Sequence, residues 1–489
     1  MKSKKILQIA QDAHKKGRLE EAKIYYYKLL KKNSDFALLH ILGVVEFQLK
    51  NFEIALKFIE KSIKLNPYCE YSHNNCGLIL QSLNKLDKAL ISYDNSININ
   101  PNFFEAHLNR GNLLNELNRI EEAIISYNNA ININPNYAKA FYNLGFTYKK
   151  LMRLEESIIC FDKAIAIDPN YTTAKIHKSS IELLKGNFQE GYALSENRFK
   201  LKSSILCERY FDKPKWSGKE SLKNKKILIV SEQGLGDIIQ YCRYVPLFKS
   251  LGAIVLLEAP KKLIPLLSSL QGVANLIEKE DKLLTYDFYY PLLSLPLAFN
   301  TTIKNLPKNI PYLSVPENLK NKWKKYIGNN GFKIGICWQG NKQSELDKGR
   351  SFPPSLFKSI SKIQNIRLIS LQKYEGAEQL ANLDNEIKIE NLPPDFDEKK
   401  NSFLDTAAIM HNLDLIITSD TSLTHLAGAL GMKTWLALQY VPDARWLLNV
   451  NTSPWYPRHK LFRQKKIGNW DTVFDEIKNE LMILISKNY

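Results

Sequence analysis

Residues 1–200 repeat one pattern of apolar and polar positions at a fixed interval. Glycine recurs every 34 residues, proline recurs every 34 residues in a phase of its own, and a small residue stands in phase between them. These positions are Gly43, Gly77, Gly111 and Gly145, Pro67, Pro101, Pro135 and Pro169, and Ala55, Ala89, Ala123 and Ser157. A fixed period of this length indicates a structural unit that is repeated along the chain.

The spacing predicts that each unit is a pair of antiparallel helices. The two small residues let the helix backbones approach each other, and proline ends the second helix because it cannot continue the hydrogen-bond ladder. One pair cannot bury its apolar face alone, so the units stack into a solenoid. We therefore expect an all-α array over residues 1–200, with degenerate repeats at its two ends. Exposed asparagines are expected to line its concave surface: Asn74, Asn75, Asn109, Asn112 and Asn143.

The hydrophobic pattern changes near residue 213. Residues 201–224 are expected to form a polar linker, and short apolar runs typical of buried parallel strands follow, separated by loops and helices. This alternation predicts a doubly wound α/β fold with one lobe over residues 225–328 and a second over 329–489. The expected strands lie within residues 226–231, 254–259, 332–340, 366–372, 413–420 and 433–438.

A glycine loop follows the first predicted strand. Gly234 and Gly236 allow the backbone to approach a phosphate or a sugar at the start of a helix. The third glycine of the dinucleotide fingerprint is absent, so we do not expect NAD binding. Asp237 follows the second glycine. From the residues alone it is either a helix cap or a functional carboxylate.

A second polar segment follows the strand expected at 413–420. Asp420, Thr421 and Ser422 lie where that strand ends, the place where open α/β sheets bind ligands. Backbone amides and hydroxyls suit a diphosphate, and a carboxylate suits sugar hydroxyls. His425 lies on the first turn of the next helix, either as a ligand contact or as a core residue.

Two resemblances organise these motifs. The 34-residue units, such as "NRIEEAIISYNNAININPN", resemble tetratricopeptide repeats. The segments "GLGDIIQYCRY", "GICWQGN…KGRSFP", "SDTSLTHLAGALG" and "SPWYPRHKLFRQ" together resemble glycosyltransferase family nine, the ADP-heptose:lipopolysaccharide heptosyltransferase-like enzymes, in the branch that carries such repeats. This second resemblance covers about residues 214–481.

The family resemblance implies a GT-B architecture with two Rossmann-like lobes, the acceptor on the first and the nucleotide sugar on the second, and a final helix that packs back toward the first lobe. It implies an inverting transfer without a cofactor or metal, with Asp237 as general base and Arg350 on the donor diphosphate. Asp420, Thr421, Ser422 and His425 fall on the donor-site motif. Ser422 stands where heptosyltransferases usually carry Gly, Arg350 where many carry Lys, and Ala444 where Trp is expected, so heptose is not established as the donor.

Composition narrows the setting. The net charge is +18, but the basic residues are scattered without an Arg-rich tract, which argues against nucleic acid and leaves a membrane surface as a possible contact. Six cysteines without metal-site spacing fit reduced thiols in the cytoplasm, and the first residues lack the apolar core of a signal peptide.

Two alternatives stand beside a transferase whose repeats recruit a protein or glycan acceptor. One is a scaffold protein with a degenerate transferase domain. The other is a relative of the repeat-bearing O-linked N-acetylglucosamine transferases, which the four family-nine segments fit less well.

Overall fold

The computed structural model describes residues 2–32, 35–201, 211–278, 285–343, 347, 349–398 and 402–486. The chain forms two compact units, Met1–Ala174 and Lys175–Tyr489. Among the described residues, no helix combines the length and the apolar character needed to cross a membrane.

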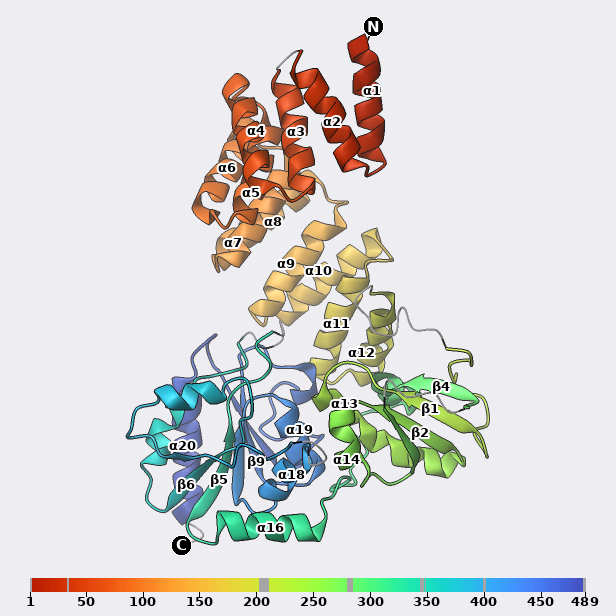
Figure 1. The fold of residues 1–489 in the computed structure, drawn as a ribbon, viewed down its shortest axis with the longest axis vertical. Coiled ribbons are helices and arrows are strands. Elements are labelled where there is room, and N and C mark those ends of the chain that lie inside the picture. Colours follow the sequence, from red (N-terminus) through yellow and green to blue (C-terminus); the bar gives the residue numbers. More distant parts are fainter. Residues whose placement is uncertain are drawn as a thin grey trace. The chain divides into compact units, whose positions relative to one another are not determined.

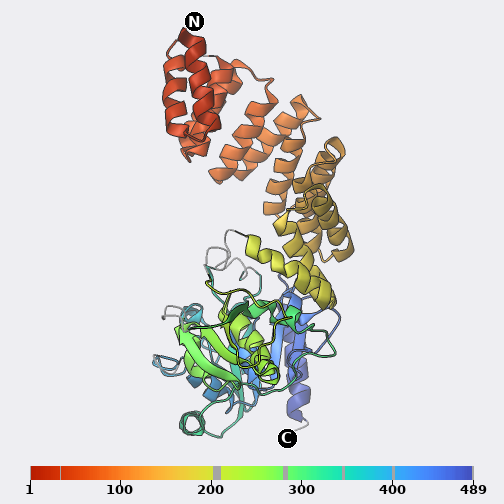
Figure 2. The ribbon, with the colours of Figure 1, turned by 90° about the vertical axis from the view of Figure 1, so that its right-hand side faces the viewer.

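The first unit is an array of helix pairs. Within each pair the two helices pack on each other, and each pair packs on the next, as the red to orange ribbon shows (Figures 1 and 2). The helices are α1 (Lys2–Lys15), α2 (Leu19–Leu30), α3 (Phe36–Gln48), α4 (Phe52–Leu65), α5 (Glu70–Ser82), α6 (Leu86–Ile99), α7 (Phe104–Glu116), α8 (Ile120–Ile133), α9 (Ala138–Lys150) and α10 (Leu154–Ile167). This is the predicted all-α solenoid.

The recurring glycines lie where two helices of a pair touch. A Cβ added at Gly77 would come within 2.5 Å of the Tyr93 ring, and one at Gly111 within 2.6 Å of the Tyr127 ring. Both rings are buried. Glycine at these positions therefore sets the close packing of each pair.

The asparagines expected to be exposed are engaged inside the array. Asn109 donates to the Asn74 side chain at 3.0 Å, and Asn143 donates to Asn112 at 2.7 Å, each linking neighbouring repeats. Asn74 is buried, and the others are half-buried. The expectation of free amides along this surface is therefore corrected, because the side chains satisfy one another.

The boundary between the two units falls within α11 (Thr172–Lys185), the first helix of the last pair, and the second unit continues with α12 (Phe188–Ser195) and the short helix η1 (Glu196–Lys200). The repeat array was expected to end at residue 200, whereas the first compact unit ends at Ala174. Part of the expected linker, residues 202–210, lies outside the described residues. The rest joins the α/β core, since Trp216 is buried there and Lys215 bridges to Tyr289.

Two parallel sheets form the body of this unit (Figure 1). The first has the order β3-β2-β1-β4 and the second β10-β9-β8-β5-β6-β7. The strands are β1 (Lys226–Val230), β2 (Ile254–Ala259), β3 (Val273–Glu278), β4 (Phe288–Pro291), β5 (Phe332–Cys337), β6 (Ile366–Ser370), β7 (Ile389–Glu390), β8 (Leu415–Thr418), β9 (Thr434–Leu438) and β10 (His459–Arg463).

The helices around the sheets are short except for two. Those of the first lobe and its exit are α13 (Leu235–Tyr241), η2 (Cys242–Leu251), η3 (Lys261–Leu263), α14 (Ile264–Leu267), η4 (Leu292–Ser294), α15 (Leu295–Ala298) and α16 (Glu317–Ile327). Those of the second are η6 (Pro354–Phe357), α17 (Lys358–Ser361), η7 (Ala377–Asn382), α18 (Leu404–Met410), α19 (Ser422–Ala429), η9 (Ala444–Trp446) and α20 (Asp471–Ser486).

Two helices differ from the expected lobe assignment. The helix α16 was expected in the first lobe, but it packs on α18, where the Trp323 indole donates to Asp405 at 2.7 Å. The final helix α20 was expected to pack back toward the first lobe. Its Phe474, Ile477 and Leu481 instead lie in the core of the second sheet, because this apolar face matches the uncovered face of that sheet.

Candidate functional site

The two sequence motifs meet where the two sheets present their carboxyl ends. The loop after β1 leads into α13, the segment after β8 leads into α19, and these two helices pack on each other. A Cβ at Gly236 would lie 2.7 Å from the His425 ring and 3.3 Å from Cα of Ser422. Glycine is therefore required for this close approach of helices from different lobes.

Asp237 uses both of its carboxylate oxygens. Oδ2 accepts a hydrogen bond from the backbone N–H of Gly234 at 3.0 Å, which caps the start of α13. Oδ1 accepts from Nη2 of Arg445 at 2.8 Å. The capping role considered from the sequence is thus present, and an ion pair between the lobes accompanies it.

Arg445 is the centre of the polar cluster. Its Nε donates to Asp443 at 2.8 Å, and its Nη1 donates to Gln240 and to Nε2 of His425, both at 2.9 Å. Burial lowers the pKa of Arg445, but the carboxylates of Asp443 and Asp237 outweigh it and hold the pKa well above the ordinary value. The guanidinium is therefore a permanent cation between the lobes.

His425 is a neutral acceptor in this cluster. Its Nε2 accepts from Arg445, so we assign the ring proton to Nδ1, which donates to the Tyr456 hydroxyl at 3.0 Å. Burial, and next the charge of Arg445, hold its pKa well below the ordinary value. The ring packs parallel to Trp446 at 5.7 Å between centroids, so it also has the core role considered from the sequence.

Asp420 lies beside this cluster at the end of β8. Its Oδ2 accepts from the Trp446 indole at 2.8 Å, and its Oδ1 is 4.0 Å from Nε2 of His425. Burial, reinforced by the charge of Asp443, raises the pKa of Asp420 to about 6. Its carboxyl group therefore changes protonation near neutral pH, as a group at a functional site often does.

The remaining predicted residues are placed around Asp420. Thr421 is buried and precedes α19, and Ser422 begins that helix and is half-buried. Next to them, the Ser419 hydroxyl is buried with no hydrogen-bond partner among the described residues.

Arg350 lies outside the Arg445 cluster. It pairs with Asp347 at 3.1 Å between Nε and Oδ1, and its Nη2 would be 2.5 Å from a Cβ at Gly340. It lies near enough that its charge lowers the pKa of Asp420, as one of the smaller influences. The structure thus joins Gly236 and Asp237 to Ser422 and His425, and leaves Arg350 on a separate loop.

Sequence reasoning did not single out Arg445, Gln240, Asp443, Trp446 or Tyr456. The signal was available in part, because "PDARWLL" and "SPWYPRHKLFRQ" stand next to the donor-site motif along the chain. What the sequence lacks is any local pattern that pairs Arg445 with Asp237, which is 208 residues away.

The repeat unit carries a small groove of its own. It has a volume of about 220 Å³ and lies between α3 and α5, lined by Val44, Phe47, Gln48, Asn75, Leu78 and Ile79. Its lining is apolar apart from the amides of Gln48 and Asn75, which contact His14 and His40.

Family models for tetratricopeptide repeats match residues 36–69, 71–103, 92–125, 111–151 and 138–171. These segments are tetratricopeptide repeats. Protein FlbA of Caulobacter vibrioides is 24% identical over 328 residues, which are 62% of this chain. The match spans 54% of FlbA, about half of that protein.

Three solved structures with a similar fold each cover a little over a third of this chain. MamA from Desulfovibrio magneticus RS-1 is 20% identical with a TM-score of 0.32, over 35% of this chain and 97% of its own. A thermophilic tetratricopeptide protein of Thermus thermophilus is 20% identical with a TM-score of 0.33, over 37% of this chain and 100% of its own. YrrB, described as having an unusual peptide-binding site, is 25% identical with a TM-score of 0.30, over 35% and 88%.

Proposed function

We propose that the second unit is a GT-B glycosyltransferase that moves a sugar from a nucleotide-sugar donor to an acceptor, with inversion and without a metal. The observation that carries the proposal is the 2.8 Å pair between Asp237 of the first lobe and Arg445 of the second, beside Asp420 and His425. Carboxylate, cation and hydroxyl groups converge there at the carboxyl ends of two parallel sheets, where ligands bind in such folds. The family-nine resemblance of the same segments supports it.

In this mechanism Asp237 is the general base. It takes the proton of the acceptor hydroxyl while the acceptor oxygen forms a bond to the anomeric carbon of the donor sugar. The bond from that carbon to the diphosphate breaks, and its electron pair leaves with the diphosphate. A carboxylate accepts about four hydrogen bonds, so the bonds from Gly234 and Arg445 leave Asp237 capacity for the acceptor.

Cations take the place of a metal in stabilising the leaving group. Arg445 stays protonated, and Arg350 carries a second positive charge near Asp420. Fixed positive charge aimed at the developing negative charge of the diphosphate lowers the barrier. Asp420 and the Ser419 hydroxyl are the polar groups available to the donor sugar and its phosphates.

The repeats are proposed to recruit the acceptor, which is a protein or a glycan. The groove between α3 and α5 supports this role, since its apolar wall and amide rim suit an extended peptide. The same groove favours the second candidate function, a repeat scaffold whose transferase unit does not turn over a donor.

A panel of nucleotide sugars tests both functions by thermal shift and by donor hydrolysis. Asp237→Asn is the matched variant, because the Asn side-chain carbonyl still accepts from the Gly234 N–H while the negatively charged carboxylate, the proposed base, is lost. The transferase predicts one donor that stabilises both proteins and is hydrolysed by the wild type alone, with a rate difference of about 10² to 10⁴-fold. If no donor stabilises either protein, the transferase proposal is wrong and the scaffold function stands.

A further inference from the structure

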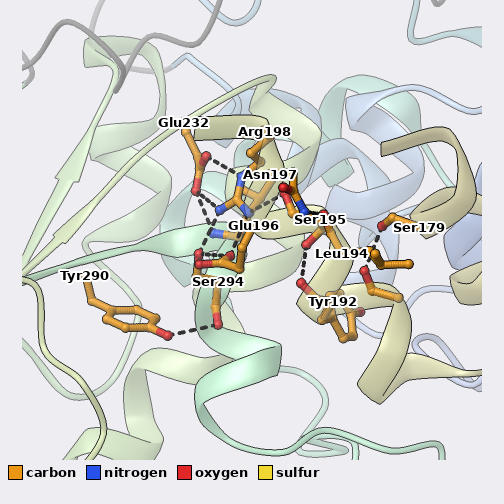
Figure 3. A network of polar contacts seen from close by, with 12 residues as sticks. Ser179, Tyr192, Leu194, Ser195, Glu196, Asn197, Arg198, Glu232, Tyr290 and Ser294 are labelled. Carbon is orange, nitrogen blue, oxygen red and sulfur yellow. Dashed lines mark hydrogen bonds and ion pairs between the residues drawn. The ribbon is translucent and has the colours of Figure 1, made fainter. Parts of the chain in front are cut away.

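A buried ion pair ties the end of the last helix pair to the glycine loop. Arg198 of η1 donates from Nε and Nη2 to the two carboxylate oxygens of Glu232, at 2.9 and 2.8 Å (Figure 3). Glu232 stands two residues after β1 and two before Gly234. Both side chains are more than nine-tenths buried. A two-pronged pair of this kind fixes orientation as well as distance.

Further hydrogen bonds hold the side chains of Arg198 and Glu232 in one arrangement. Arg198 also donates to Glu196 and to the Ser294 hydroxyl, both at 2.8 Å (Figure 3). Glu232 also accepts from the backbone N–H of Leu293 at 3.2 Å. Residues of η1 and of η4 thus hold the same two side chains. A buried pair whose hydrogen bonds are all made stabilises one arrangement over its alternatives.

The same helix pair also contacts the far end of α13. The Phe188 ring of α12 packs on Trp455 at 5.9 Å between centroids, and Trp455 packs on Tyr241 at 6.0 Å. Tyr241 is the last residue of α13. The segment 188–198 therefore holds the segment 232–241 at both ends, and Asp237 lies between them.

The backbone between the two holding points is strained. Gln233 has φ of +61°, in the left-handed region that residues other than glycine seldom adopt. Such a conformation persists where the surrounding contacts determine it, and it relaxes when they are removed. Glu232, its direct neighbour, is the buried anchor on one side.

We propose that Arg198 is a positioning residue for the candidate base. Through Glu232 it fixes the Gln233–Gly234 turn and so the place of Asp237 against Arg445. The catalytic part of this role rests on the proposed function. The same contacts couple η1 to the loop that presents Asp237, so a partner or modification that moves η1 would also move this loop.

The test uses Arg198→Lys in the full chain, which keeps the positive charge but loses the two-pronged geometry. Arg119→Lys is the matched control, since Arg119 makes the same two-pronged contact with Glu122 on an exposed repeat surface. Backbone hydrogen exchange is followed for the amides of residues 232–237 and for those of β2. We expect exchange about ten-fold faster at 232–237 in Arg198→Lys, with β2 as protected as in the wild type and no change in the control.

Glu232→Gln gives a second approach, because it removes the charge from the other side and is expected to give the same local loss of protection. Unchanged exchange at 232–237 in both variants overturns the proposal, and so does a rise of equal size in β2, which means general destabilisation. With a donor in hand, Arg198→Lys is expected to lower kcat while leaving donor KM near the wild-type value. If exchange rises locally but no donor is found, the positioning role stands and the transferase proposal fails separately.

Discussion

Asp237 and Arg445 pair across the two lobes at 2.8 Å, although 208 residues separate them in the chain. The pair does more than hold the lobes together, because the same guanidinium also contacts Asp443, Gln240 and His425. Arg445 therefore determines where the carboxylate of Asp237 points and which protonation form His425 takes.

Arg445→Gln is expected to disable the site and to weaken the fold. The side chains of Asp237 and Arg445 are only 15% and 17% exposed, so the substitution leaves a poorly hydrated carboxylate without its cation. Removing one partner of a buried pair costs about 3 kcal/mol or more. Urea unfolding measures this loss, and we expect donor turnover to fall about 10²-fold or more.

Arg153→Gln is the control for Arg445→Gln. Arg153 pairs with Glu156 on an exposed helix surface, where solvent screens the charges, so no measurable loss of stability is expected. Equal effects of the two substitutions, or full turnover in Arg445→Gln, would remove Arg445 from the mechanism.

The stability of the second unit is expected to depend on Asp420 between pH 4 and 6. Burial raises its folded-state pKa to about 6 from the ordinary 3.8, so the folded protein holds a proton that the unfolded chain releases. The protonated carboxyl group of Asp420 therefore stabilises the folded state fully below pH 4, and this stabilisation is lost as the pH rises to 6. A difference of this size corresponds to about 3 kcal/mol.

Asp420→Asn isolates this contribution. The Asn carbonyl still accepts from the Trp446 indole but carries no charge at any pH. The variant is expected to unfold at a higher temperature than the wild type at pH 7.5 and to converge with it below pH 4. Parallel melting curves with a constant offset across this range would show that Asp420 does not titrate as proposed.

Replacing the recurring glycines by alanine is expected to have unequal effects. Alanine favours a helix over glycine by about 1 kcal/mol, whereas forcing a methyl group into a packed contact costs about 1–3 kcal/mol. At Gly77 the new Cβ would meet the buried Tyr93 ring at 2.5 Å, but at Gly145 the nearest atoms are 3.0 Å away. Helical circular dichroism on heating should show Gly77→Ala destabilised and Gly145→Ala close to the wild type.

The repeats were predictable because their signal is local and periodic. Each glycine faces the residue 16 positions later, as Gly77 faces Tyr93 and Gly111 faces Tyr127. The six expected strands correspond to β1, β2, β5, β6, β8 and β9. The strands β3, β4, β7 and β10 were not predicted, and β3 shows why, since its partly exposed residues break the continuous apolar run.

The site was predictable only as two separate halves. Helix and strand signals placed Asp237 at the start of a helix and Asp420 at the carboxyl end of a strand, where the structure also has them. Arg445, which bonds to Asp237 and acts on Asp420 through its charge, follows a short loop without periodicity, and its contact with Asp237 forms only when the two lobes pack. The Arg198–Glu232 pair was missed for the same reason, because Arg198 comes from η1 and Glu232 from the loop after the interior strand β1.

Arg243 is a buried cation that bonds to no carboxylate among the described residues. It donates to the carbonyls of Gln240 and Trp455 at 2.9 and 2.8 Å and to the Tyr312 hydroxyl at 3.1 Å. Its guanidinium also lies 4.7 Å from the ring centres of Tyr312 and Tyr456. These contacts span η2 and the second lobe, so Arg243 helps to join the lobes.

Arg243→Lys is expected to destabilise the second unit by about 2 kcal/mol or more, because a compact ammonium neither stacks on two rings nor reaches three acceptors at once. Arg458→Lys is the matched control, since Arg458 also donates to a backbone carbonyl, that of Gly431, but on an exposed surface. Urea unfolding of the full chain compares the two. If both variants unfold at the wild-type urea midpoint, the prediction is wrong. In that case apolar packing holds the lobes together, and Arg243 does not contribute to the stability of the fold.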